Sequence, residues 1–364
     1  MNKERTVANR RDFFKTVAGA AAGMYVAGRG ASASAVQAPA GRRQVSIAGK
    51  RVRVVDIHSH ATVPEVDPVL ANTEYAKQGG GRPLGPDRIA LIDKQGIDIQ
   101  ALSINGFWWY EVKDRDLADR IVRAQNQGLA KFVSQHPDRF VGMSSSSLQF
   151  PELAAQQLDE GVKKYGLRAA AIGGHVNGED LSLPKFDPFW AKAAELGVVV
   201  FMHPGGAENI VKEGGFRGRG DLGNIIGNPL ETTYFLSRLI YDGTLDKFPA
   251  LKVCGAHAGG YLPSYLGRSE AACVVRGNAN CANKKKPSEY LKSQILVDSM
   301  ILSDEGLRHL VNEFGASQIV YGTDNPLNWP VTVDLILNAS WMNNADKEAI
   351  LGGNLIKLLK ITAS

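Results

Sequence analysis

The segment His58-Ser59-His60 carries two imidazoles at a spacing suited to metal binding. It directly follows the apolar run 52–57, whose valines and isoleucine are typical of a strand. Side chains two residues apart point to the same face of a strand, so both rings would project together from its carboxyl end. Two converging imidazoles are a usual start of a zinc-type site. Two histidines near a strand end can also be ordinary polar residues, so a metal site requires further ligands elsewhere in the chain.

Three further apolar runs end in residues that could complete such a site. Four of the seven histidines lie at strand ends, a bias that is hard to attribute to chance. Of the others, His175 closely follows a fifth run, whereas His136 and His309 lie in helical or surface-like contexts and are interpreted as structural. His203 follows the run 198–202, His257 follows the run that starts at 252, and Asp324 follows the run that starts at 319.

Short β-rich runs alternate with amphipathic helical segments along the chain, which predicts an α/β fold. We expect a single-domain (β/α)8 TIM barrel over residues 36–364, with catalytic residues at the carboxyl ends of the strands. A doubly wound sheet would give a similar alternation, but it would normally carry a glycine-rich phosphate turn after its first strand, where this chain has His58-Ser59-His60. The expected strands are 52–57, 97–103, 140–143, 169–172, 198–202, 252–254, 295–297 and 319–321.

The expected helices include 116–135, 152–165 and 187–196, each with apolar residues at helical spacing. Residues 62–86 lack clear periodicity and are rich in Gly and Pro. We therefore expect a long loop there, over the active-site face.

The first 35 residues are typical of a twin-arginine export signal. Arg10-Arg11 precedes two phenylalanines and a weakly apolar stretch over residues 16–28, and small residues offer cleavage after Ala33 or Ala35. The apolar stretch is shorter than the roughly 20 residues that a membrane span needs. We expect a soluble periplasmic protein that uses the twin-arginine export machinery and has no stable membrane insertion. A basic N-terminus without a targeting role is the alternative.

Charge and cysteine content narrow the range of partners. Residues 1–35 hold six basic and two acidic residues, a net +4 of the chain's +5, so the remainder is close to neutral and predicts no nucleic-acid binding. No C-x-x-C motif occurs, which argues against a thiolate zinc site. Cys254 lies in an apolar run and is expected to be a buried thiol, whereas Cys273 and Cys281 flank a loop and could form a disulfide in an oxidising compartment.

Taken together, the motifs resemble those of the amidohydrolase superfamily. They are similar in particular to the branch of 2-amino-3-carboxymuconate 6-semialdehyde decarboxylase and related metal-dependent decarboxylases, and the resemblance covers nearly all of residues 36–364. Segments 96–100, 174–181 and 287–290 support that branch. The motifs of the superfamily are His58-x-His60, His203-Pro204, His257-Ala258-Gly259-Gly260 and Thr323-Asp324-x-Pro326.

The resemblance implies one divalent metal ion, expected to be zinc, held by three imidazoles and a carboxylate. Such an ion lowers the pKa of bound water to about 7. Superfamily members with two metals often use a modified lysine at the end of strand four, where this chain has Gly173-Gly174. We therefore expect a single ion. The implied ligands are His58, His60, His203 and Asp324.

The resemblance also assigns roles around the metal. His257 would transfer a proton between water and substrate, unless it is only a buried core histidine. Asp324 would act in catalysis as well as in metal binding, unless it caps a helix that starts near Pro326. Arg82 and Arg268 would bind substrate carboxylates, with a surface salt bridge as the alternative for each. His175 would line the substrate pocket or bond a loop carbonyl. Arg268 would reach the neighbouring subunit's site, which implies a homodimer.

One departure from the branch limits the prediction of a substrate. Its members carry an aromatic and an acidic residue after the His-Pro pair of strand five, whereas this chain has Gly205-Gly206. Our leading hypothesis is a carboxy-lyase that decarboxylates an aromatic or unsaturated carboxylic acid, with metal-bound water and His257 as proton shuttle. A hydrolase of an ester, lactone or amide on the same site is the alternative. A periplasmic binding protein without turnover is a third reading.

Overall fold

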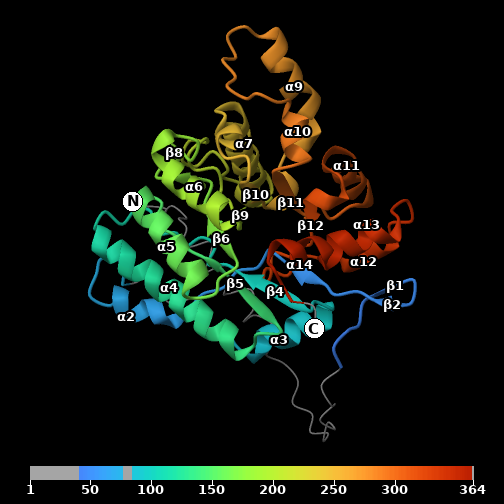
Figure 1. The fold of residues 1–364 in the computed structure, drawn as a ribbon, viewed down its shortest axis with the longest axis horizontal. Coiled ribbons are helices and arrows are strands. Elements are labelled where there is room, and N and C mark those ends of the chain that lie inside the picture. Colours follow the sequence, from blue (N-terminus) through green and yellow to red (C-terminus); the bar gives the residue numbers. More distant parts are fainter. Residues whose placement is uncertain (1–40, 77–83, 363–364) are drawn as a thin grey trace, which may run out of the picture.

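The computed structural model describes residues 41–76 and 84–362, and within them the chain forms a parallel β-barrel surrounded by helices (Figure 1). Eight strands follow one another in the order β3-β4-β5-β6-β9-β10-β11-β12, and every neighbouring pair is parallel. The first and last strands meet where the Ile57 N–H donates to the Tyr321 carbonyl at 3.0 Å. The predicted (β/α)8 barrel is confirmed. The strands are β3 (Val55–Asp56), β4 (Ile99–Leu102), β5 (Phe140–Ser144), β6 (Ala169–Ile172), β9 (Val199–Met202), β10 (Lys252–Gly255), β11 (Ile295–Asp298) and β12 (Ile319–Val320).

Each expected strand is present, but the first is shorter than predicted. Val52 donates its N–H to the Val45 carbonyl, next to a hairpin of β1 (Ser46–Ile47) and β2 (Lys50–Arg51). The first half of the apolar run 52–57 therefore belongs to the edge of this hairpin. Its second half forms β3, which is fully buried, as expected for a strand covered on both faces.

Helices follow the strands and cover the barrel (Figure 1). The predicted helices 116–135, 152–165 and 187–196 correspond to α4, α5 and α6, with ends shifted by at most two residues. Asp114 caps α4 by accepting hydrogen bonds from the backbone of Asp116 and Leu117. The longer helices are α3 (Pro86–Gln95), α4 (Arg115–Gln135), α5 (Pro151–Lys163), α6 (Asp187–Leu196), α7 (Asn228–Tyr241), α9 (Leu266–Val275), α11 (Asp304–Phe314) and α12 (Val333–Asn338). The short ones are α2 (Asp67–Leu70), α8 (Thr244–Lys247), α10 (Pro287–Leu291), α13 (Asn344–Glu348) and α14 (Asn354–Leu358).

The stretch 62–86 is not one continuous loop, contrary to the prediction. It contains a 3-10 turn at Pro64–Val66 followed by α2, each with a proline in its first turn. Val66 and Leu70 pack with residues of α4 in a small apolar cluster. Residues 77–83 of this stretch lie outside the described residues, as do residues 1–40 with the predicted export signal. Among the described residues, no helix combines the length and apolar character that a membrane crossing requires.

Helix α9 and the turn after it form an arm that projects from the barrel at the top of Figure 1. A disulfide joins Cys273 and Cys281 across this turn, eight residues apart, and Cys254 is a buried free thiol. Both cysteine predictions are confirmed.

Removing this disulfide should lower the free energy of unfolding. Closing a loop this short stabilises a protein by roughly 2 kcal/mol through the unfolded state. We expect thermal unfolding of a Cys273→Ser, Cys281→Ser double variant to show that loss at unchanged metal content. Equal stability of the wild type before and after reduction would contradict the expectation.

Candidate metal centre

Four side chains from three strand ends converge inside the mouth of the barrel. His58 and His60 follow β3, His203 follows β9 and Asp324 follows β12. One ligand atom from each lies within 4.8 Å of the others. We call these four residues the ligand cluster. The structure thus brings together the whole set of metal ligands that the sequence predicted.

The Asp324 carboxylate lies at the middle of the ligand cluster. Its Oδ1 is 2.8 Å from His60 Nε2 and 3.0 Å from His58 Nε2. A left-handed backbone at Asp324, with φ of 57°, accompanies this inward placement. The helix-cap alternative is wrong, because the next helix, α12, begins only at Val333.

The donor atoms fit a metal ion. His203 Nδ1 lies 2.9 Å from the Pro204 carbonyl, which places the proton on Nδ1 and leaves a lone pair on Nε2. Within the described residues, the buried Nε2 of His203 has no hydrogen-bond partner, and the Nε2 of His58 faces only the Asp324 carboxylate, 3.0 Å away. Buried polar atoms without partners are rare and call for an explanation. Three imidazoles and a carboxylate that meet at one point supply it, because this is a donor set of catalytic zinc-type sites.

The groups of the ligand cluster shift one another's pKa values. Burial alone would raise the pKa of Asp324, but His58 and the neighbouring imidazoles lower it well below its usual value. Burial would lower the pKa of His58, and the two carboxylates of Asp324 and Asp298 raise it to about 10. Burial and the surrounding imidazoles lower the pKa of His203 far below its usual value. An ionised Asp324 and a neutral His203 are the forms that bind metal.

Asp298, which the sequence analysis did not identify, supports the ligand cluster by binding the outer nitrogen of the His58 ring. It ends β11, is fully buried, and its Oδ2 lies 2.6 Å from His58 Nδ1. It also accepts hydrogen bonds from the backbone of His257 and Ala258 at 3.1 and 2.8 Å. Such a carboxylate fixes the ring orientation and raises the basicity of a metal-binding histidine. The available signal was an acidic residue directly after the apolar run 295–297.

We expect Asp298→Asn to weaken metal binding by about 10- to 100-fold, the usual effect of losing such a partner. The amide keeps the size of the side chain but carries no charge to orient the His58 imidazole. Metal affinity measured by competition with a chromogenic chelator would show the change. Asp304→Asn, at the half-exposed start of α11, is the matched control, and equal affinities of both variants would refute the expectation.

Asp56 is a second buried carboxylate that the sequence analysis did not identify. It accepts hydrogen bonds from the His58 N–H, from Gln100 Nε2 and from Thr323 Oγ1, at 2.9, 2.7 and 2.6 Å. Burial raises its pKa to about 6 despite these bonds. Asp56 therefore ties together the first, second and last strands of the barrel, directly beneath the ligand cluster.

His257 lies beside the ligand cluster. Its Nε2 is 3.9 Å from Asp324 Oδ2, and its ring centre is 5.1 Å from that of His58. Both His257 and Ala258 adopt a left-handed backbone, with φ of 53° and 58°. Gly260 is required in this turn, because a Cβ there would lie 2.1 Å from the Pro229 carbonyl oxygen. The placement agrees with the expected position of a proton-transferring group next to the metal.

The residues predicted to bind substrate do not belong to the ligand cluster. Arg82 lies outside the described residues. Arg268 is exposed on α9, on the projecting arm. His175 lies on β7 (His175–Val176), which pairs with β8 (Glu179–Asp180), and its Nδ1 accepts a hydrogen bond from the Gly178 N–H at 3.0 Å.

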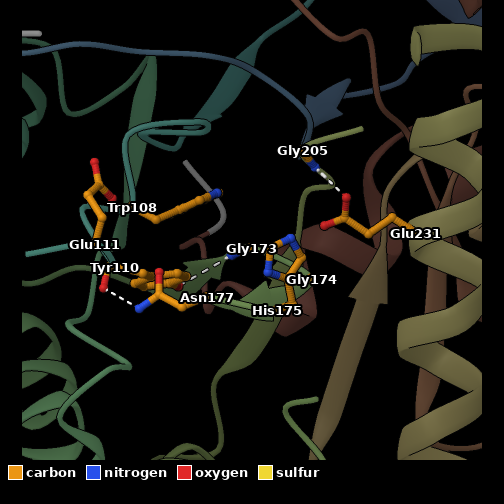
Figure 2. Close-up of a pocket in the computed structure, with 9 residues that line it drawn as sticks. All are labelled: Trp108, Tyr110, Glu111, Gly173, Gly174, His175, Asn177, Gly205 and Glu231. Atoms are coloured by element: carbon orange, nitrogen blue, oxygen red, sulfur yellow. Dashed lines mark hydrogen bonds between the residues drawn. The ribbon is translucent and has the colours of Figure 1, made fainter. Parts of the chain in front are cut away.

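A hollow whose lining includes Gly205, two residues after His203, is the candidate substrate pocket (Figure 2). His175 is one of the residues that line it. Glu231 of α7, also missed from the sequence, is buried there and accepts hydrogen bonds from the Gly205 and Ala207 backbone. The lining residues are Trp108, Tyr110, Glu111, Gly173, Gly174, His175, Asn177, Gly205 and Glu231.

Comparisons with known proteins identify the family of this chain. The amidohydrolase family model matches residues 55–361. The chain is 34% identical over 283 residues to 2-amino-3-carboxymuconate-6-semialdehyde decarboxylase of Dictyostelium discoideum, an alignment that covers 75% of this chain and 76% of that protein.

Solved structures of decarboxylases have a fold similar to that of this chain. A 2,6-dihydroxybenzoate decarboxylase in complex with 2,6-dihydroxybenzoate superposes with a TM-score of 0.74 at 25% identity, covering 85% of this chain and 99% of that one. A 5-carboxyvanillate decarboxylase of Novosphingobium aromaticivorans, with manganese and 4-hydroxy-3-methoxy-5-nitrobenzoic acid, also gives 0.74, at 26% identity and 85% and 96% coverage. The chain therefore belongs to the amidohydrolase family, and it is an enzyme.

Proposed function

We propose that the enzyme is a metal-dependent decarboxylase of an aromatic or unsaturated carboxylic acid. The observation that carries the proposal is the ligand cluster with His257 beside it. The similar proteins described above are decarboxylases, which supports the reaction class.

A bound divalent cation would supply positive charge that stabilises negative charge on substrate oxygens or activates water. The chain's own residues would do the rest. Decarboxylation breaks the bond between the carboxyl carbon and its neighbour, carbon dioxide leaves, and the electron pair left on the neighbouring carbon takes up a proton. We propose that His257 delivers that proton, and the support is the 3.9 Å distance between its Nε2 and Asp324 Oδ2 in the ligand cluster.

We propose zinc as the resident metal. Three imidazole nitrogens and one carboxylate suit Zn²⁺, and manganese, found in the 5-carboxyvanillate decarboxylase, is the rival. Metal analysis of protein purified without added metal, followed by reloading of stripped protein with each ion, would decide. A higher kcat with manganese at equal occupancy would overturn the choice of zinc.

The reaction is tested by incubating metal-loaded enzyme with aromatic and unsaturated acids and measuring carbon dioxide. Gas release that stops on chelation and returns with metal supports the proposal. Release of a new carboxylate from esters, lactones or amides, without carbon dioxide, would favour the hydrolase. Tight ligand binding without turnover by fully loaded protein would favour the binding-protein alternative.

We further propose that residues 1–35 direct export through the twin-arginine machinery to the periplasm. The support is the Arg10-Arg11 pair ahead of the apolar stretch. Replacing both arginines by lysine should keep the protein in the cytoplasm, as measured by cell fractionation. Unchanged export of that variant would contradict the proposal.

We also propose that Arg268 completes the site of a neighbouring subunit in a homodimer. Its exposure on the projecting arm supports this placement. Arg268→Ala and Asp324→Asn should each be nearly inactive, but co-expressed chains should regain activity. In a mixed dimer one site has both an intact Asp324 and an intact Arg268. Absence of complementation in a dimer confirmed by light scattering would contradict the proposal.

A further inference from the structure

Glu231 is a buried carboxylate next to the loop that follows His203. It is 1% exposed and lies in the first turn of α7, where the helix dipole favours an acidic side chain. Its Oε2 accepts hydrogen bonds from the Gly205 N–H at 2.9 Å and from the Ala207 N–H at 2.7 Å. Figure 2 shows the first of these bonds. One carboxylate therefore holds the backbone that directly follows a predicted metal ligand.

The peptide unit between Pro204 and Gly205 connects Glu231 to His203. Its carbonyl lies 2.9 Å from His203 Nδ1, and its N–H donates to Glu231. The bond is trans, and a trans peptide is planar, with its C=O and N–H pointing in opposite directions. Glu231 and the His203 imidazole therefore lie on opposite sides of one rigid unit. When the carboxylate fixes the N–H, it also fixes the direction of the carbonyl that receives the His203 hydrogen bond.

This connection acts on the basicity of the imidazole as well as on its orientation. A carboxylate makes a stronger hydrogen bond to a backbone N–H than a neutral acceptor does. Hydrogen bonds in a chain polarise one another, so the Pro204 carbonyl becomes a better acceptor. A better acceptor on Nδ1 makes Nε2 a more basic ligand, which is the effect of a carboxylate that contacts a metal-binding histidine directly. Asp298 makes such a direct contact with His58.

The end of β6 leaves room for the Glu231 carboxylate. A Cβ on Gly174, which follows β6, would lie 2.5 Å from Glu231 Oε1. A side chain at this position would therefore displace the carboxylate. The end of β6 also holds His203 itself, because the His203 N–H donates to the Ile172 carbonyl at 2.9 Å. The backbone bond to β6 and the bond to the Pro204 carbonyl together set the place of the imidazole.

We propose that Glu231 is a positioning residue of the metal centre and acts on His203 through the Pro204–Gly205 peptide unit. The inference rests on the metal site of the proposed function, but not on the choice between decarboxylation and hydrolysis. Glu231 has for His203 the role that Asp298 has for His58, with one peptide unit between the carboxylate and the ring. The property that Glu231 controls is metal binding.

Zinc affinity, measured by competition with a chromogenic chelator, is the first test. Glu231→Ala should bind zinc about 10- to 100-fold more weakly, the usual effect of losing such a partner. Glu231→Gln keeps an oxygen that can accept both N–H groups but loses the charge, so its affinity should lie between those of Glu231→Ala and wild type. Glu195→Gln, exposed on α6 and paired with Lys192, is the control and should bind zinc like wild type. Equal affinities of Glu231→Ala and wild type would overturn the proposal.

Proton NMR of cobalt-loaded protein distinguishes this role from simple support of the fold. Paramagnetic Co²⁺ shifts the ring N–H signals of bound imidazoles far outside the normal range, and these signals disappear in heavy water. At full cobalt occupancy, Glu231→Gln and Asp298→Asn should each shift a different ring N–H signal, since one acts on His203 and the other on His58. Gly174→Ala, which displaces the carboxylate without removing it, should shift the same signal as Glu231→Gln.

The results separate this inference from the proposed function. Unchanged ring N–H signals in Glu231→Gln, or a shift only of the signal that Asp298→Asn moves, would overturn the link to His203, even if the variant unfolds at a lower temperature. A wild-type protein that binds neither zinc nor cobalt would refute the metal centre and this inference with it. The expected signals in a protein that releases no carbon dioxide from any acid would sustain the inference and refute only the decarboxylase.

Discussion

Asp324→Asn should lower kcat for decarboxylation by roughly a thousandfold or more, a loss expected when the charge at the centre of a metal site is removed. The Asp324 Oδ1 lies within 3.0 Å of two imidazole nitrogens and is held in its ionised form by them. A neutral amide is a weaker ligand, so metal content after dialysis should fall together with activity. Metal analysis by mass spectrometry and a carbon dioxide assay would measure both.

Asp334→Asn serves as the control for Asp324→Asn. Asp334 lies on α12, is exposed and pairs with Arg43. It should leave both readouts unchanged. Full metal content and near-normal activity in Asp324→Asn would remove Asp324 from the site and with it the proposed chemistry.

His257→Asn should separate metal binding from catalysis. We expect kcat to fall by about 10²- to 10⁴-fold, the usual contribution of a general acid or base. Metal content should stay at the wild-type level, because His257 lies beside the ligand cluster and not within it. Rates and metal content measured on the same preparations of wild type and variant would show both effects.

His309→Asn is the control for this substitution, because its imidazole lies on α11 near Glu313, 41% exposed. Loss of metal from His257→Asn would make His257 a ligand. Unchanged activity would make it the buried core histidine that was the alternative interpretation.

The fold and the ligand cluster could be predicted because both follow from short-range rules. The His58-Ser59-His60 spacing places two rings on one face of a strand, and parallel strands bring their carboxyl ends to one side of a barrel. His203 and Asp324 each directly follow an apolar run, so their positions were fixed as soon as the strands were recognised. The same rules also placed His257 beside them.

The supporting residues could not be predicted in this way. Asp298 and Asp56 matter because of partners 240 and 267 residues away in the chain, His58 and Thr323. Glu231 lies in the first turn of α7, where an acidic residue is common, and its contact with the Gly205 loop is visible only in the structure. The 3-10 turn and α2 within 62–86 were hidden by a glycine- and proline-rich composition. The export signal, the binding of substrate by Arg82 and Arg268, and the homodimer remain predictions.

The meeting of β3 with β12 has a consequence for how the enzyme matures. The two segments that supply His60 and Asp324 are 264 residues apart, yet they lie side by side only in the finished barrel, where Ser59 bridges Asn325. A nascent chain cannot offer a complete coordination shell until its last strand has been synthesised and docked. Tight metal binding therefore follows the completion of the barrel. A chain truncated before residue 324 would carry no tightly bound ion.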